Sequence, residues 1–230
     1  MSNDVHPLRG WFEIVIATLR REDLFLRNYL QPYSPGAYEY WEPGIKLLPE
    51  PVIHYLLLRE LWSVGYPRAL GWEHPYPDCP SLSLDLAIYR QSPNEHVHGC
   101  CPEHVIEVKI KRFGGNLDVQ KLIWWDLLRL LWFDQAAHRY LLLLTIGPDR
   151  TLLVNDVDDL VGMRLGPNRE QYSPERLISE VVTQSVQDRP YYLQHLDRVS
   201  EVLWDEFETC FTGNQVGRVR VSLIEVSRRS

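Results

Sequence analysis

Two stretches in the middle of the chain, residues 81–90 and 104–111, alternate apolar and polar side chains and constrain the fold most. This alternation is typical of strands with one buried face, because successive side chains point to opposite sides of a sheet. In the first stretch Asp85 lies opposite the aliphatic face, and in the second Glu107 and Lys109 do. If the two strands pair, Asp85, Glu107 and Lys109 share one surface.

The rest of the pattern predicts one α/β domain with a mixed central sheet flanked by helices. Further strands are expected at 68–74, at 139–147, where RYLLLLTIG is apolar enough to be buried, and at 217–226. A helix of 51–64 begins with proline in its first turn and ends at Gly65. The other expected helices span 9–30, 117–137, 174–184 and 190–209.

Length, charge and cysteine usage restrict the class of protein. The 230 residues suit one domain, and a formal charge of −7 argues against a non-specific nucleic-acid binder that relies on phosphate neutralisation. The N-terminus does not resemble a signal peptide. The apolar stretch 117–133 contains five charged or amide side chains and does not resemble a membrane span. The four cysteines lack framework spacing, so we expect a reduced, cytoplasmic protein without membrane contact.

The shared surface of Asp85, Glu107 and Lys109 has a chemical interpretation and a plainer one. Two carboxylates suit Mg²⁺, and an ammonium beside them can orient or activate an attacking water. A Glu-x-Lys triplet also arises by chance, and cross-strand glutamate and lysine form ordinary solvated ion pairs. The Glu-x-Lys triplet therefore indicates a catalytic site only if other elements bring further polar side chains to the same surface.

Two side chains on the flanking helices point to the same surface. On a helical wheel Glu50 lies on the inward side of the helix at 51–64, whereas Glu60 lies on the outward side. Gln120 opens the apolar face of the helix at 117–137, in line with Trp124. The alternatives are a favourable glutamate at a helix N-terminus for Glu50 and a backbone-satisfied amide for Gln120.

The order of Glu50, Asp85, Glu107-Val108-Lys109 and Gln120 along helix, strand, strand and helix resembles the PD-(D/E)XK nuclease superfamily, with its restriction-endonuclease-like core. The resemblance covers residues 49–147, with 1–48 as an N-terminal helical extension and 148–230 as a C-terminal helical and strand addition. Two departures are Leu84 in place of the proline before Asp85, and Trp124 in place of a tyrosine.

The resemblance implies a metal-dependent endonuclease. Asp85 and Glu107, with the Val108 carbonyl, would hold Mg²⁺ or Mn²⁺, and Glu50 would bind a second ion or a metal-bound water. Lys109 would position or activate the attacking water, and Gln120 would order the site. The reaction would expel the 3′-oxygen and leave a 5′-phosphate.

Partner expectations follow from the same resemblance. Nucleic acid is the expected substrate, with DNA favoured over RNA, and Lys111 and Arg112 could contact its phosphates or remain solvated charges. The negative net charge points to affinity supplied by a homo-oligomer or a larger complex, in restriction, repair or anti-phage defence.

Two alternatives remain at this stage. One is a non-catalytic member of the same fold that acts as a binding or scaffold subunit. The other is a zinc-binding interaction module built from the soft ligands His96, His98, Cys100, Cys101 and His104, although their spacing matches no known zinc finger.

Overall fold

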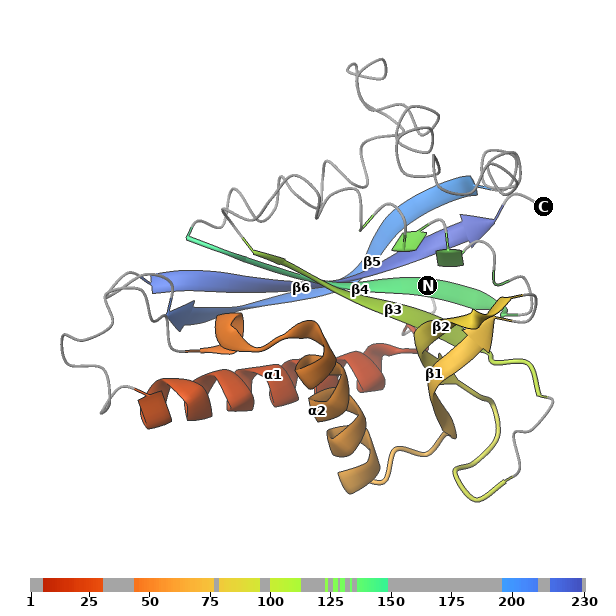
Figure 1. Ribbon diagram of the computed structural model, residues 1–230, viewed down its shortest axis with the longest axis horizontal. Helices are drawn as coiled ribbons and strands as arrows, with labels where there is room; N and C mark the ends of the chain where they lie inside the picture. The colour runs from red at the N-terminus through yellow and green to blue at the C-terminus, as the bar shows by residue number, and fades with distance from the viewer. Residues whose placement is uncertain are drawn as a thin grey trace, which may run out of the picture.

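The computed structural model describes residues 6–30, 44–76, 79–95, 100–112, 136–148, 196–210 and 216–228, together with Ile123, Asp126, Leu127, Arg129, Leu130 and Phe133. This part of the chain forms a six-stranded mixed sheet with two helices, α1 and α2, on one face (Figure 1). The predicted α/β class and mixed sheet are confirmed.

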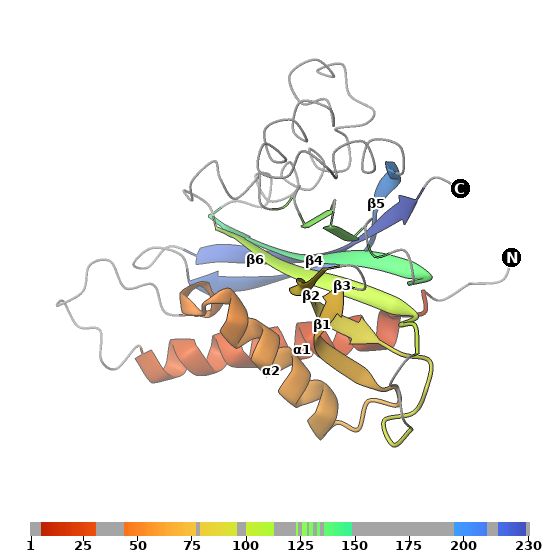
Figure 2. The same cartoon turned by 45° about the vertical axis from the view of Figure 1, so that its right-hand side comes forward.

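The sheet has the order β1-β2-β3-β4-β6-β5. Its strands are β1 (Leu70–Tyr76), β2 (Cys79–Ile88), β3 (His104–Arg112), β4 (His138–Gly147), β5 (Leu196–Cys210) and β6 (Val216–Arg228). Only β3 and β4 run parallel, and the other four pairs are antiparallel. A parallel pair requires a crossover connection. The described residues of that connection, from Ile123 to Leu130, are helical and lie on the face opposite α1 and α2 (Figure 2).

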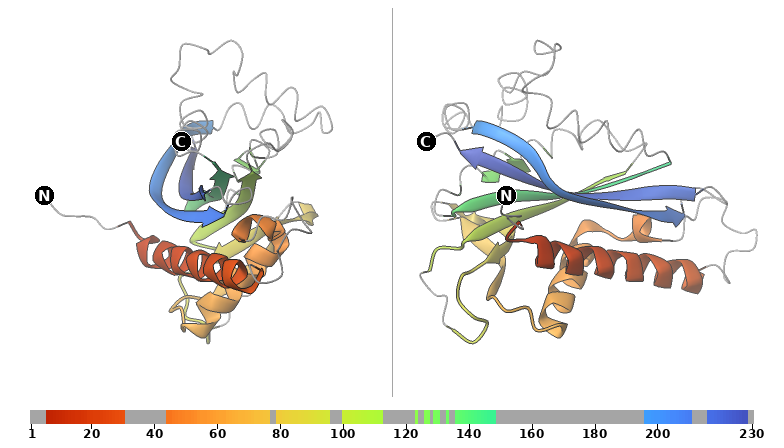
Figure 3. Two further views of the ribbon diagram at one scale, coloured as in Figure 1. Left: turned by 90° about the vertical axis from the view of Figure 1, so that its left-hand side faces the viewer. Right: turned by 180° about the vertical axis from the view of Figure 1, so that it is seen from behind.

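The core lies between the sheet and the two helices. α1 (Arg9–Leu30) buries the stripe of Trp11, Val15 and Leu19, and α2 (Glu50–Ser63) buries Ile53 and Leu57. Both helices pack on the face that carries the even-numbered side chains of β3 and β4. Seen from behind, α1 runs beneath β5 and β6 (Figure 3). No helix in the described part of the chain is long and apolar enough to cross a membrane.

A short 3-10 helix, η2 (Ile45–Leu47), connects this core to the start of α2. The buried carboxylate of Asp23 on α1 accepts hydrogen bonds from the Ile45 N–H, at 2.9 Å, and from the hydroxyl of Thr209 on β5. Gly44 precedes η2 with φ +130°, a conformation that favours glycine. These contacts determine where α2, and with it Glu50, begins.

The helix predicted for 190–209 is wrong over the residues that the structure describes, because 196–210 form strand β5. Leu203 and Phe207 are spaced by four, and this spacing places side chains on one face of a strand as well as of a helix. Thirteen paired positions with β6, with irregularities near both Arg198 and Glu201, select the strand. The helix predicted for 174–184 lies outside the described residues.

Candidate active site

The candidate site lies where β2 and β3 separate. In the described part of these strands only three positions pair, ending at Leu86 and Ile106, whereas β3 stays paired with β4 as far as Arg112. Beyond Ile106, the main-chain N–H groups of β3 on this side donate to carboxylates. The Val108 N–H donates to Asp85 Oδ2 at 2.7 Å, and the Ile110 N–H donates to Glu50 Oε2 at 3.3 Å. Because buried main-chain donors need acceptors, two acids replace the missing strand partner.

The opening brings Glu50 of α2 to Lys109, although α2 packs on the other face of the sheet. The Lys109 ammonium lies 3.0 Å from Glu50 Oε1 and 3.1 Å from Asp126 Oδ2. Burial lowers the pKa of Lys109, but the carboxylates of Asp126 and Glu50 outweigh it, so the net shift of the pKa is upward. Lys109 is thus held as an ammonium between two acids.

Glu107 is the most deeply buried acid of the site, with 2% of the residue exposed. Burial and then the charge of Asp85 raise the pKa of Glu107 well above its usual value, and the Asp85 carboxyl also shares a hydrogen bond with it. Arg129 partly offsets this shift, with its Nη2 atom 3.2 Å from Glu107 Oε1. Asp85 and Glu107 therefore form a close carboxyl pair that favours binding of either a proton or a cation.

Asp126 and Arg129 belong to the site although the sequence interpretation did not include them. Asp126 is 3% exposed, and its Oδ1 atom lies 3.4 Å from Arg129 Nη1. The same guanidinium donates to the Ser83 carbonyl at 2.6 Å, which ties the crossover helix to β2. A signal was present in the sequence, because Asp126 falls within the apolar stripe of Ile123, Leu127 and Leu130.

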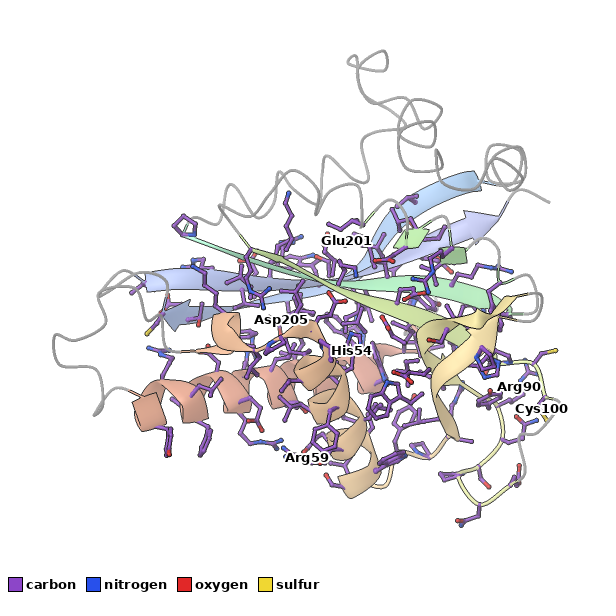
Figure 4. All side chains as sticks on the ribbon, viewed as in Figure 1. His54, Arg59, Arg90, Cys100, Glu201 and Asp205 are labelled. Carbon is purple, nitrogen blue, oxygen red and sulfur yellow. The ribbon has the colours of Figure 1, made fainter. Side chains whose placement is uncertain are left out.

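His54 is a third site residue that the sequence interpretation did not include. It follows Glu50 by one turn of α2, and its side chain is 10% exposed. Its Nδ1 atom lies 3.6 Å from Asp85 Oδ1, and its buried Nε2 atom has no hydrogen-bond partner. Figure 4 shows His54 where α2 meets the sheet, whereas Arg59 lies at the outer side of the helix.

The structure distinguishes the two glutamates of α2. Glu50 contacts Lys109 and the Ile110 N–H, whereas both carboxylate oxygens of Glu60 accept hydrogen bonds from Arg21 on α1. Glu50 reaches the sheet as predicted, whereas Glu60, predicted to face outward, pairs with α1 and has 16% of its side chain exposed, compared with 31% for Glu50. Gln120 and its neighbour Trp124 lie outside the described residues.

The two cations predicted to bind phosphates lie at the end of β3. Arg112 donates to the carbonyls of Lys46, at 2.9 Å, and Leu48, at 2.6 Å, so its guanidinium holds the segment that leads into Glu50. Lys111 is partly exposed on the face of Glu107 and Lys109. The geometry thus gives Arg112 a structural task and leaves phosphate binding as a prediction for both.

The soft ligands of the possible zinc loop do not converge within the described residues. His104 begins β3 and is 1% exposed, and burial lowers its pKa to about 4. A guanidinium can only donate, so the Nε2 atom of His104 accepts a hydrogen bond from Arg68, at 3.2 Å. Cys100 lies between β2 and β3, where its sulfur is 3.5 Å from Gln91 Nε2, and away from His54 (Figure 4). His96 and His98 lie outside the described residues.

The charges and donor atoms of the site are those that a hard divalent cation uses. Four carboxylates, of Glu50, Asp85, Glu107 and Asp126, surround the two permanent cations Lys109 and Arg129. No group of three or more His, Cys, Asp or Glu side chains in the described part of the chain is arranged to hold a metal ion. A cation here would thus use the Asp85–Glu107 pair together with main-chain oxygen and water, as Mg²⁺ commonly does.

Comparison of the chain with protein-family models, with characterised proteins and with solved structures gives no match. The functional interpretation therefore depends on the geometry of the site.

Proposed function

We propose that this protein is a metal-dependent nuclease of the PD-(D/E)XK type that hydrolyses phosphodiester bonds, with DNA as the favoured substrate. The observation that carries the proposal is the Asp85–Glu107 carboxyl pair beside Lys109 at the opening between β2 and β3. The order α2, β2, β3, helical crossover and β4 supports it, because it is the order that the resemblance implies for a restriction-endonuclease-like core.

The residues present fit Mg²⁺ or Mn²⁺. Asp85 and Glu107 would hold the ion, with the Val108 carbonyl as a further oxygen ligand and Glu50 near a second ion or a bound water. The ion would lower the pKa of its water and neutralise the charge that develops on the phosphate. The high pKa of Glu107 supports this fit, since burial and the Asp85 charge disfavour its anion unless a cation is nearby.

Lys109 would act on both the substrate and the attacking water. The Lys109 ammonium, held at 3.0 Å by Glu50, would orient the water toward phosphorus and stabilise negative charge in the transition state. The reaction would proceed by in-line attack, break the bond to the 3′-oxygen and leave a 5′-phosphate.

Binding of the nucleic acid needs positive charge that this acidic chain does not supply in bulk. We therefore propose that the protein acts as a homo-oligomer or within a larger complex. Restriction, repair and anti-phage defence are all settings in which such a nuclease would operate.

The proposal is tested by incubating the purified full chain with supercoiled plasmid and Mg²⁺ or Mn²⁺. Asp85→Asn is a suitable variant because an amide oxygen can still accept the Val108 N–H while the charge is lost. Asp85→Asn and Lys109→Ala should each reduce cleavage by about 10²–10⁴-fold. Glu50→Gln should also reduce cleavage, because Glu50 holds the Lys109 ammonium. Glu60→Gln is its matched control on the same helix and should keep wild-type activity, because Glu60 pairs with Arg21.

Each result has a distinct meaning. Cleavage that survives both Asp85→Asn and Lys109→Ala would exclude this site as its source. Mn²⁺ binding without cleavage under any condition would favour the non-catalytic binding subunit. Bound zinc without cleavage would favour the interaction module.

A further inference from the structure

Lys109 is held from both sides of the sheet, by one carboxylate from each helical layer. Glu50 reaches its ammonium from α2 at 3.0 Å, and Asp126 reaches it from the crossover helix at 3.1 Å. The lysine side chain is 17% exposed, so water solvates little of it. A lysine has a flexible four-carbon stem, and a single acid at one side would leave its ammonium free to swing.

Asp126 also separates the two cations of the site. Its Oδ2 atom lies 3.1 Å from Lys109, and its Oδ1 atom lies 3.4 Å from Arg129, which in turn lies 3.2 Å from Glu107. One buried carboxylate thus contacts both cations that lie beside the Asp85–Glu107 pair. Asp126 shares its helical stripe with Ile123, Leu127 and Leu130, which are each 1% exposed or less.

We propose that Asp126 is a positioning residue that fixes the Lys109 ammonium for the hydrolysis proposed above, on which this inference rests. It acts through Lys109 and does not contact the substrate. A displacement of about 1 Å in a reacting group can reduce the rate about 10²-fold, so the loss of Asp126 should affect turnover more than substrate binding.

The kinetic test compares Asp126→Asn and Asp126→Glu with the wild type in Mg²⁺-dependent cleavage. Asp126→Asn keeps the shape of the side chain but cannot pair with both cations, and kcat should fall about 10²-fold with KM within about threefold. Asp126→Glu restores the charge and should recover part of kcat. Asp205→Asn is the matched control, because Asp205 pairs with Arg20 at the surface. Equal kcat for wild type and Asp126→Asn would overturn the proposal.

A second measurement does not require nuclease activity. The chain has only four lysines, at positions 46, 109, 111 and 121, so selective ¹³Cε-lysine labelling gives a simple NMR spectrum. The Lys109 signal is identified by its loss in Lys109→Arg. Asp126→Asn should shift or broaden this signal and leave that of Lys46 unchanged.

The cleavage kinetics and the NMR spectrum test the proposed nuclease function and the positioning role of Asp126 separately. A wild-type protein that never cleaves would refute the proposed function, and a moved Lys109 signal would still support the positioning by Asp126. An unchanged Lys109 signal in Asp126→Asn would overturn the positioning whether or not the protein is a nuclease.

Discussion

Replacing Asp126 with asparagine should make the metal-free protein more stable at neutral pH. The carboxyl group is 3% exposed, and burial raises its pKa from 3.8 to about 6, against the opposing attraction of Lys109 and Arg129. The asparagine amide has nearly the shape of the neutral acid but never ionises. The substitution therefore removes the cost of keeping a buried charge.

The size and sign of the effect follow from the two pKa values. The folded protein binds the Asp126 proton more tightly than the unfolded chain does, so stability falls as pH rises between about 4 and 6. A shift of about two units corresponds to about 3 kcal/mol. Asp126→Asn should therefore match the wild type near pH 4 and exceed its free energy of unfolding by about 3 kcal/mol at pH 8.

Urea denaturation in EDTA, followed by the fluorescence of the eight tryptophans, measures this difference at both pH values. Asp205→Asn is the control, because it breaks a surface ion pair with Arg20 and should change stability by less than about 1 kcal/mol. A destabilised Asp126→Asn at pH 8, or an equal difference at pH 4 and pH 8, would refute the reasoning.

Three further predictions concern the metal, the approach to α2 and the edge of the sheet. Mn²⁺ at about 100 times its Kd should raise the free energy of unfolding by about 2.7 kcal/mol, and Glu107→Gln should abolish this gain in thermal melts. Gly44→Ala should destabilise the protein by about 3 kcal/mol, because the added Cβ would lie 2.6 Å from Asp23 Oδ1 at a φ of +130°; an unchanged melting temperature would contradict this. Arg220→Met should cost about 3 kcal/mol, since it leaves two glutamates of β5 without the guanidinium that lies 2.7 and 2.8 Å from them. Urea denaturation should show a smaller loss of unfolding free energy for Arg220→Met at acid pH if the uncompensated charges of the two glutamates cause the loss.

Local periodicity predicted the parts of the site that lie on strands. A strand has a period of two, so the alternation around Asp85 and around Glu107 and Lys109 determines which side chains share a face. The pairing of β2 with β3 then brings Asp85 beside Glu107, as expected. The helical wheel likewise predicted the inward orientation of Glu50, which lies 3.0 Å from Lys109.

The tertiary structure decided how the helices reach this surface. Glu50 and His54 contact it only because β2 and β3 separate beyond Ile106, and no local pattern encodes such an opening. The sequence places Asp126 in the apolar stripe of its helix, but only the packing of that helix brought it to Lys109.

Contacts between distant parts of the chain also explain why residues 196–210 form β5 and not the predicted helix. A spacing of four residues suits both a helix and a strand, and pairing with β6 made the choice. By itself, the sequence determined which residues share a face within each strand, because that depends on neighbouring dihedral angles alone. Which faces meet depends on contacts between residues far apart in the chain, and only the folded structure decided that.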